Sequence, residues 1–345
     1  MKPGFAELFK AAQQTVEMCE IQPNEKVVVY CDTRQNPVLA EAFHTACVAA
    51  GTDVTLIRTL HRFPETNPPP TAIAAMKEAD MVFDLATESW FYADCTPEIL
   101  ATGTRMLLFV DVLEENIVSR PPDREVYERA ARAADMLQHG SEFRVTTPEG
   151  SDFTCRRGDR RAKSQKGFVN RPGQHDLYAN TTIAFAPIET EAEGVLYLNG
   201  PQILYPQYTY VVKNPVRIEV ERGRIIHIDD SHEDGRIFKH WIEQFDDPNV
   251  YTIAHFGFSL DHRARDLSRY DLSVWESYYG GVLVAFGAND SKSLGGKTRA
   301  KGHSDSMLLH ASFYVDGRPL IIDGEFTEES GLRPGAKGLS QEETP

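Results

Sequence analysis

The sequence predicts an α/β N-terminal domain with a parallel sheet, followed by an α+β C-terminal domain with a largely antiparallel sheet. Short β-branched segments alternate with helical patterns up to about residue 138, which is typical of strand–helix–strand units. Beyond that point, turn signals separate pairs of short apolar segments, as in hairpins. A length of 345 residues allows about two domains. We therefore expect domains over 1–140 and 141–345, with 331–345 as a flexible tail.

The first half is predicted to alternate strands with helices. In chain order we expect a strand over 26–30, a helix over 37–50 that Gly51 ends, strands over 53–60, 81–85 and 106–112, and a helix from Pro122 to about 137. The segment 106–112 is nearly all apolar, as in a strand covered on both faces. No GxGxxG motif follows the first strand, so nothing supports a dinucleotide site.

The second half is predicted to consist mainly of hairpins. The expected strand pairs are 143–147 with 151–156, 217–221 with 225–229, and 311–315 with 320–323. One helix interrupts them, because apolar residues recur at helical spacing between Ile237 and Phe245, before Pro248. We find no internal repeat and no heptads.

Charge and hydropathy exclude several classes of partner. The chain carries 36 Lys and Arg against 51 Asp and Glu, a formal net charge of −15. This charge disfavours sequence-independent binding to nucleic-acid phosphates. No apolar segment approaches the ~18 residues of a membrane span. We therefore expect neither a nucleic acid nor a membrane as partner.

The cysteines and the N-terminus indicate a reducing compartment. The N-terminal segment lacks the apolar core and small-residue cleavage site of a secretory signal, so a cytoplasmic location is expected. The five cysteines contain no CxxC pair and fit reduced thiols better than a disulfide framework or a structural zinc site. Any metal should therefore be held by His and carboxylates. A homo-oligomer is expected, with its size left open.

Basic residues gather between Arg156 and Arg171, despite the acidic total. A solvated loop is the favoured interpretation, because runs of like charge are usually hydrated. The alternative is a rim that attracts anions, or a contact to a partner subunit.

A histidine followed two residues later by a carboxylate places both side chains on one face of a strand, where they can bind one ion. The pattern occurs three times, at His227-Ile228-Asp229, His232-Glu233-Asp234 and His303-Ser304-Asp305. The first closes a hairpin strand and the second opens a helix, so both have structural explanations. The third follows a Gly-rich loop and leads into an apolar strand, where binding sites are commonly built.

His255 is a further candidate ligand, because it lies in an otherwise apolar segment with Phe256 and Phe258 on the opposite face. The alternative is that His255 is a buried histidine of the core with no functional role. If His255 joins His303 and Asp305, two imidazoles and one carboxylate form a facial triad suited to Fe(II) and dioxygen. Zinc hydrolysis would use the same ligands. No GxSxG elbow, phosphate loop or Cys–His neighbour pair supports another chemistry.

Further short motifs accompany these residues between about Ala79 and Glu325. They are Thr102–Arg105, Gly150–Phe153, Pro187, Glu189, Glu193–Gly194, Asp247–Tyr251, His255–Gly257, Tyr279–Gly280, Gly295–Lys297 and His303–Asp305. Each is weak alone, but in order and spacing the set resembles the 2,5-dihydroxypyridine 5,6-dioxygenases. These are bacterial ring-cleaving enzymes of nicotinate catabolism, related to the aminopeptidase T type of metallopeptidase.

The resemblance implies a mononuclear Fe(II) site at His255, His303 and Asp305. It also implies that a two-metal peptidase site would need a Glu in place of His255 and another in the strand leading to Pro187. That strand reads Thr181–Phe185 and holds no carboxylate. The dioxygenases are expected to carry a histidine in the loop after the third strand. The corresponding stretch 88–94 has none, so Glu88, Tyr92 or Asp94 are candidates to carry a proton there.

We therefore predict a non-haem Fe(II) dioxygenase that opens a small hydroxylated N-heteroaromatic ring, such as 2,5-dihydroxypyridine, or a related aromatic. Glu189 is the candidate for proton transfer or for anchoring a ring N–H or O–H. Glu88, Tyr92 and Tyr279 are candidates for substrate binding, and Trp275 and Tyr278 for the pocket wall. The alternative is a single-metal hydrolase of an amide or peptide, and a third possibility is a binding protein without catalysis. Ligand type alone does not distinguish Fe(II) from Zn(II) or Mn(II).

Overall fold

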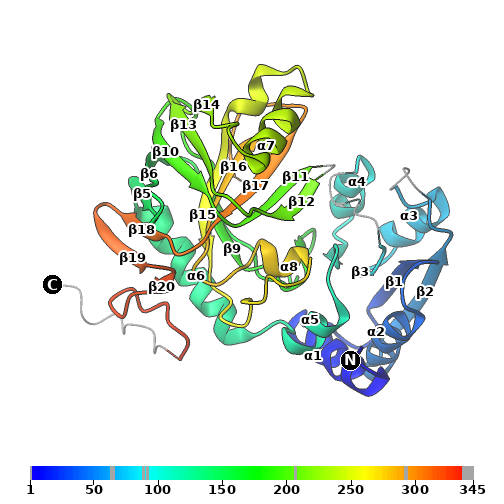
Figure 1. Cartoon of the computed structure of the whole chain (residues 1–345). Coiled ribbons are helices and arrows are strands. Elements are labelled where there is room, and N and C mark those ends of the chain that lie inside the picture. Colours follow the sequence, from blue (N-terminus) through cyan, green and yellow to red (C-terminus); the bar gives the residue numbers. More distant parts are fainter. Residues whose placement is uncertain are drawn as a thin grey trace. The chain divides into compact units, whose positions relative to one another are not determined.

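The computed structural model describes residues 2–62, 67–87, 90, 93–205, 208–290 and 294–335 (Figure 1). The chain forms two compact units. The first comprises Met1–Tyr127, Gln165–Asn180 and Asp271–Ser273, and the second comprises Glu128–Ser164, Thr181–Tyr270 and Val274–Pro345. The predicted boundary near residue 140 assigns the later segments of the first unit to the second domain. Of the predicted tail, residues 336–345 lie outside the described part of the chain.

The first unit is built on a five-stranded parallel sheet with the order β2-β1-β3-β4-β8. Its strands are β1 (Lys26–Asp32), β2 (Asp53–Thr59), β3 (Met81–Asp84), β4 (Arg105–Leu108) and β8 (His175–Leu177). Its helices are α1 (Phe5–Met18), α2 (Pro37–Ala49), α3 (Pro70–Lys77), α4 (Cys95–Ala101), α5 (Glu114–Ser119) and the start of α6 (Arg124–His139). The predicted parallel sheet is confirmed.

Two apolar clusters explain why these strands read as continuous apolar segments. One cluster joins Val27, Phe83 and Leu107 to α1 and α2, and the other joins Val28, Val82 and Met106 to α3 and α4. Alternate residues of the same strands therefore pack in opposite directions, and β3 and β4 are buried along their whole length. The sequence did not reveal β8, because three residues give no alternation to recognise.

Two carboxylates whose pKa values shift in opposite directions lie at the carboxyl ends of β1 and β3. Asp32 accepts hydrogen bonds from Thr87 Oγ1 and from the main-chain N–H groups of Thr87, Arg34 and Gln35. Burial opposes its charge, but these donors outweigh burial and hold the pKa of Asp32 below its usual value. Asp84 has fewer donors, and burial raises its pKa to about 7.

The second unit is a sandwich of two antiparallel sheets. The eight-stranded sheet has the order β14-β13-β10-β6-β5-β18-β19-β20, and the seven-stranded sheet has the order β12-β11-β17-β16-β15-β9-β7. Aromatic side chains fill the space between them. Phe153 of β6 contacts Phe256 of β15 with ring centroids 5.5 Å apart, and Phe143 of β5 contacts Phe185 of β9 at 4.3 Å. The predicted antiparallel architecture is confirmed.

The strands of the eight-stranded sheet are β5 (Glu142–Thr146), β6 (Asp152–Arg156), β10 (Ala192–Leu198), β13 (Val216–Glu221), β14 (Arg224–Ile228), β18 (Ser312–Val315), β19 (Arg318–Ile322) and β20 (Glu325–Phe326). Those of the seven-stranded sheet are β7 (Ala162–Ser164), β9 (Thr182–Phe185), β11 (Pro201–Tyr205), β12 (Tyr208–Val211), β15 (Ile253–Ser259), β16 (Val282–Gly287) and β17 (His303–Leu308). The unit also holds α7 (Glu233–Glu243), the 3₁₀ helix Pro248–Tyr251 and the end of α8 (Leu272–Trp275). The predicted helix within 237–245 corresponds to α7, which buries Phe238, Trp241 and Ile242. No helix among the described residues combines the length and apolar character needed to cross a bilayer.

The basic cluster departs from the favoured interpretation of a solvated loop at two positions. Arg157 and Arg160 are buried. The Arg157 guanidinium donates to the main-chain carbonyls of Leu137 and Gln138, and that of Arg160 pairs with Glu189. Buried guanidinium groups require such partners, and through these contacts the two residues join separate segments of the second unit.

Replacing Asp84 with Asn should change the pH dependence of stability. The folded chain keeps the Asp84 proton up to about pH 7, whereas the unfolded chain releases it near its ordinary pKa of 3.8. The free energy of unfolding of the parent protein should therefore fall as pH rises through this window, by up to about 4 kcal/mol for this group. The advantage of Asp84→Asn over the parent should grow over the same range.

Urea unfolding of both proteins at several pH values, followed by circular dichroism, measures this difference. Asp53→Asn is the control, because Asp53 is exposed in the same sheet and its charge stays in water. A stability difference between parent and Asp84→Asn that does not vary with pH would contradict the argument.

Candidate metal centre

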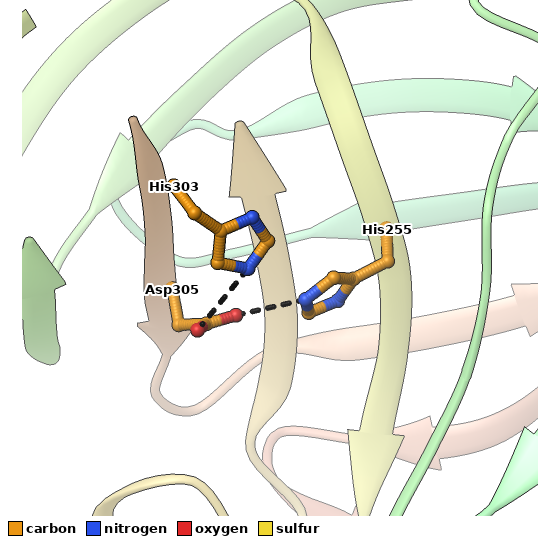
Figure 2. Close-up of side chains that lie close together, drawn as sticks. All are labelled: His255, His303 and Asp305. Atoms are coloured by element: carbon orange, nitrogen blue, oxygen red, sulfur yellow. Dashed lines mark ion pairs between the residues drawn. The ribbon is translucent and has the colours of Figure 1, made fainter. Parts of the chain in front are cut away.

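The structure brings together the side chains of His255, His303 and Asp305 (Figure 2). One potential ligand atom from each lies within 4.8 Å of the others. The Asp305 carboxylate stands between the imidazoles, with Oδ1 2.9 Å from His255 Nε2 and Oδ2 3.4 Å from His303 Nε2. The two imidazole centroids are 5.2 Å apart. Side chains from two strands that are distant in sequence thus face one point.

The register of the seven-stranded sheet produces this convergence. His303 and Asp305 belong to β17 and His255 to β15, and β16 runs between these strands (Figure 2). Ala285 of β16 pairs with Asp305, and Gly287 pairs with His303. Directly paired residues point to the same face of a sheet, so small residues lie between the ligand-bearing strands. Their size leaves room for the imidazoles and the carboxylate to approach one another above β16.

A bulge in β15 adjusts the position of His255. Ile253 pairs with Phe286 and Phe256 pairs with Val284, so Ala254 and His255 together lie opposite Ala285. Such a two-against-one pairing re-aims a side chain and is common next to functional sites. Phe256 continues the opposite face and packs into the sandwich core.

Main-chain contacts fix the His303 ring. Its Nδ1 lies 2.8 Å from the carbonyl oxygen of Ala288 and donates to it, so that Nε2 is the ring nitrogen that faces Asp305. Ala288 is followed by Asn289, a buried residue whose Nδ2 donates to the carbonyl oxygens of Ile253 and Ala254. Asn289 therefore links the segment that orients His303 to the segment that carries His255.

The electrostatics of the cluster suit a cation. Burial raises the pKa of Asp305, but the charges of His303 and His255 lower it more, so that it stands far below its usual value. Burial lowers the pKa of His303, and Asp305, the Ala288 carbonyl and Glu276 together raise it above its usual value. His255 Nδ1 is buried and has no hydrogen-bond partner, and the buried Asp305 Oδ1 has His255 Nε2 beside it at 2.9 Å. Buried polar atoms rarely lack partners, and a carboxylate beside two imidazoles is a donor set for Fe(II), Zn(II) or Mn(II).

A family model described as 2,5-dihydroxypyridine 5,6-dioxygenase matches residues 7–328. The chain belongs to this family. The resemblance noted in the short motifs is thereby confirmed, and the protein is an enzyme of a ring-cleaving dioxygenase family. The 2,5-dihydroxypyridine 5,6-dioxygenase of Pseudomonas putida KT2440 is 29% identical over 268 residues, which cover 75% of this chain and 75% of that protein.

Two solved structures share the fold of this chain. The structure of 2,5-dihydroxypyridine dioxygenase from Pseudomonas putida KT2440 matches with a TM-score of 0.82 at 23% identity, covering 94% of this chain and 98% of that chain. AmpT from Thermus thermophilus matches with a TM-score of 0.66 at 13% identity, covering 93% of this chain and 99% of that chain. Both likenesses concern the architecture.

The other candidates from the sequence lie apart from the cluster or outside the described residues. Glu189 forms an ion pair with Arg160 and accepts hydrogen bonds from Lys297 N and Asn289 Nδ2. Burial opposes its charge, but these partners hold the pKa of Glu189 below its usual value. The Tyr279 ring packs against Phe326 and under the Arg265 guanidinium. Glu88 and Tyr92 fall outside the described residues.

The two competing His-x-acid patterns occupy structural positions. His227 is exposed on β14, at the edge of the eight-stranded sheet. His232 is the N-cap of α7, where its Nδ1 accepts a hydrogen bond from Gly235 N. Trp275 is buried with Nε1 donating to the Arg269 carbonyl.

No motif in the sequence pointed to Tyr205, which lies beside His303, or to Glu276, which accepts a hydrogen bond from the Tyr205 hydroxyl. Tyr205 pairs with His303 across β11 and β17, and its hydroxyl lies 3.2 Å from Glu276 Oε1. Neither residue belongs to a recognisable motif. The available signal was an aromatic at the last position of an apolar strand, which also occurs in ordinary sheets.

Enlarging Ala285 should weaken metal binding without disturbing the sandwich core. The side chain of Ala285→Leu would occupy the space between His255 and Asp305 above β16, whereas Ala285→Ser would barely enlarge it. We expect metal affinity to fall at least about ten-fold in Ala285→Leu and to stay near the parent value in Ala285→Ser. Metal content after dialysis against a graded chelator, with circular dichroism as a folding check, measures the effect. Full metal retention by folded Ala285→Leu would contradict the register argument.

Proposed function

We propose that this family member is a non-haem Fe(II)-dependent dioxygenase that opens a small hydroxylated N-heteroaromatic ring, such as 2,5-dihydroxypyridine or a related aromatic. The observation that carries the proposal is the convergence of His255, His303 and Asp305 at one buried point. The name of the Pseudomonas putida relative supports the substrate class. The other substrate would be dioxygen.

The proposed ligands divide the work of holding the ion. His255 and His303 would offer neutral nitrogen donors, and Asp305 would offer the one negative charge. When bound, Fe(II) supplies redox chemistry toward dioxygen, open coordination positions and about one net positive charge toward a ring hydroxyl. The hydrogen bond from His303 Nδ1 to Ala288 would keep the imidazole in the binding tautomer throughout.

The donor set fits one metal ion better than two. A two-metal hydrolase site needs several carboxylates to bring two cations within about 4 Å. In the part of the chain that the structure describes, these three side chains are the only group of His, Cys, Asp and Glu close enough together to hold a metal ion, and β9 holds no carboxylate. This pattern disfavours a two-metal hydrolase, whereas a single-metal hydrolase would use the same three ligands and is distinguished from the dioxygenase by the experiment below.

Proton transfer during ring opening needs a group other than the three ligands. Glu189 stays a prediction for this role, although a carboxylate paired with a guanidinium is a weak proton acceptor. Glu88 and Tyr92 stay predictions for substrate binding, as does Tyr279. The five cysteines are all unpaired, which supports the proposal that the enzyme works in the reducing cytoplasm.

Replacing His303 with Ala should abolish metal binding and turnover. The parent protein loaded anaerobically should hold about one iron per chain and consume oxygen with 2,5-dihydroxypyridine, because three protein ligands suffice for a facial triad. His303→Ala should hold almost none and show turnover at least about a hundred-fold lower, with unchanged circular dichroism. Iron analysis and an oxygen electrode measure both quantities.

His227→Ala is the matched control, since His227 belongs to the same His-x-Asp pattern but is exposed on β14. It should bind iron and turn over like the parent. Undiminished turnover in His303→Ala would refute the assigned site. Zinc-dependent amide hydrolysis without oxygen uptake by the parent would favour the hydrolase instead.

A further inference from the structure

A buried carboxylate lies near the three candidate ligands without belonging to their cluster. Glu276 is 9% exposed, and its charge acts on the His303 imidazole. Its position is fixed by the main chain, because its carbonyl oxygen accepts hydrogen bonds from Ser259 Oγ at 2.7 Å and Thr182 Oγ1 at 2.9 Å. These hydroxyls come from β15 and β9, so the sheet that carries the ligands also holds Glu276.

Tyr205 connects Glu276 to the ligand face of that sheet. Since Tyr205 pairs with His303, the two side chains share a face, and their ring centroids are 6.4 Å apart. The Tyr205 hydroxyl donates to Glu276 Oε1 at 3.2 Å, and the Tyr205 carbonyl accepts a hydrogen bond from Trp241 Nε1 at 3.0 Å. Tyr205 is thus held at its main chain and orients the carboxylate at its hydroxyl.

We propose that Glu276, positioned by Tyr205, determines which ring the enzyme accepts, by receiving a hydrogen bond from a ring N–H or hydroxyl and by repelling a ring carboxylate. The inference rests on the proposed function, because it concerns a substrate bound at the His255–His303–Asp305 site. An ionised carboxylate only accepts hydrogen bonds and has several acceptor positions, so a donor on the substrate can add a hydrogen bond to the one from Tyr205. A second carboxylate brought beside it in a buried site is repelled strongly, because screening by water is weak there.

This arrangement selects a chemical class. Hydroxylated N-heteroaromatics, whose ring nitrogen can carry a proton, present a donor to Glu276. Hydroxylated aromatic acids of the same ring size can bind a metal through their hydroxyl but place a negative charge near Glu276. Sites built to pair a polar group discriminate more strongly than apolar pockets do.

The test uses Glu276→Gln, Tyr205→Phe and the parent, each loaded with Fe(II) under anaerobic conditions. Binding of 2,5-dihydroxypyridine and of 2,5-dihydroxybenzoate is measured by calorimetry without oxygen, and kcat and KM are then measured with oxygen. Glu221→Gln is the charge-matched control, because Glu221 is exposed at the end of β13. Iron content and thermal unfolding are recorded for every variant.

Glu276→Gln should keep about one iron per chain and bind 2,5-dihydroxypyridine at least about ten-fold more weakly, the loss expected for a hydrogen bond to a charged group. The ratio of its affinities for 2,5-dihydroxypyridine and 2,5-dihydroxybenzoate should fall by a similar factor. In turnover, the change should appear in KM more than in kcat. Tyr205→Phe should shift both quantities in the same direction by a smaller factor. Glu221→Gln should match the parent.

Unchanged binding and preference in Glu276→Gln would overturn the proposal, and so would loss of its iron, which would make Glu276 part of the metal site. If Glu276→Gln does not fold, Tyr205→Phe decides, and parent-like preference there overturns the proposal. If the parent binds the pyridine but consumes no oxygen, the proposed reaction fails while the binding comparison still decides the role of Glu276. A parent that binds neither ring rejects both.

Discussion

The placement of one buried carboxylate between two imidazoles is the constraint on which the rest of the site depends. Asp305 is only 5% exposed, and removing a carboxylate from water costs free energy unless positive charge compensates it. His255 Nε2 and His303 Nε2 both lie within ion-pair distance of it. A cation at this point would supply the missing charge more completely than the imidazoles do. The cluster is therefore coherent as a cation site and costly as a purely structural feature.

The sandwich makes this arrangement reproducible, because the two faces of β15, β16 and β17 have separate tasks. One face carries Phe256 and Val284 into the aromatic core, and the other carries the ligands and the small residues between them. A slip of one residue in register would exchange the two faces. The apolar core thus fixes the register, and the register fixes the positions of the candidate ligands. Side chains on paired strands are also held more exactly than side chains on loops.

The pair His303 and Asp305 could be predicted because strand periodicity places them on one face, and because the Gly-rich loop before them and the apolar strand after them distinguish them from the two other His-x-acid patterns. His255 was a candidate from its apolar segment, but an isolated histidine there is usually a core residue, and only the resemblance to a family joined it to His303 and Asp305. The bulge that re-aims it has no sequence signal, and nor does the short strand β8, whose pairing with β4 depends on long-range contacts.

The burial of Arg157 and Arg160 was missed for a similar reason, because charge runs reveal composition but not the carbonyl groups that a guanidinium will meet. Glu276 lies in no motif at all, and only the pairing of Tyr205 with His303 brings it to notice.

The contacts of Glu189 suggest a different use for this carboxylate than direct chemistry. One of its oxygens is paired with Arg160, and the other accepts hydrogen bonds from Lys297 N and Asn289 Nδ2. Asn289 in turn contacts the carbonyl groups of Ile253 and Ala254, and the neighbouring Ala288 carbonyl orients His303. Glu189 therefore fixes the loop on which both histidine segments depend. Three hydrogen-bond donors stabilise the ionised form of a carboxylate and make it a poor group for proton transfer. The same contacts hold the carboxylate in place, which suits a residue that positions ligands. The two glutamates thus differ in kind: Glu189 is paired with a guanidinium and positions the segments that carry the candidate ligands, whereas Glu276 accepts a hydrogen bond from a tyrosine on the face that carries those ligands.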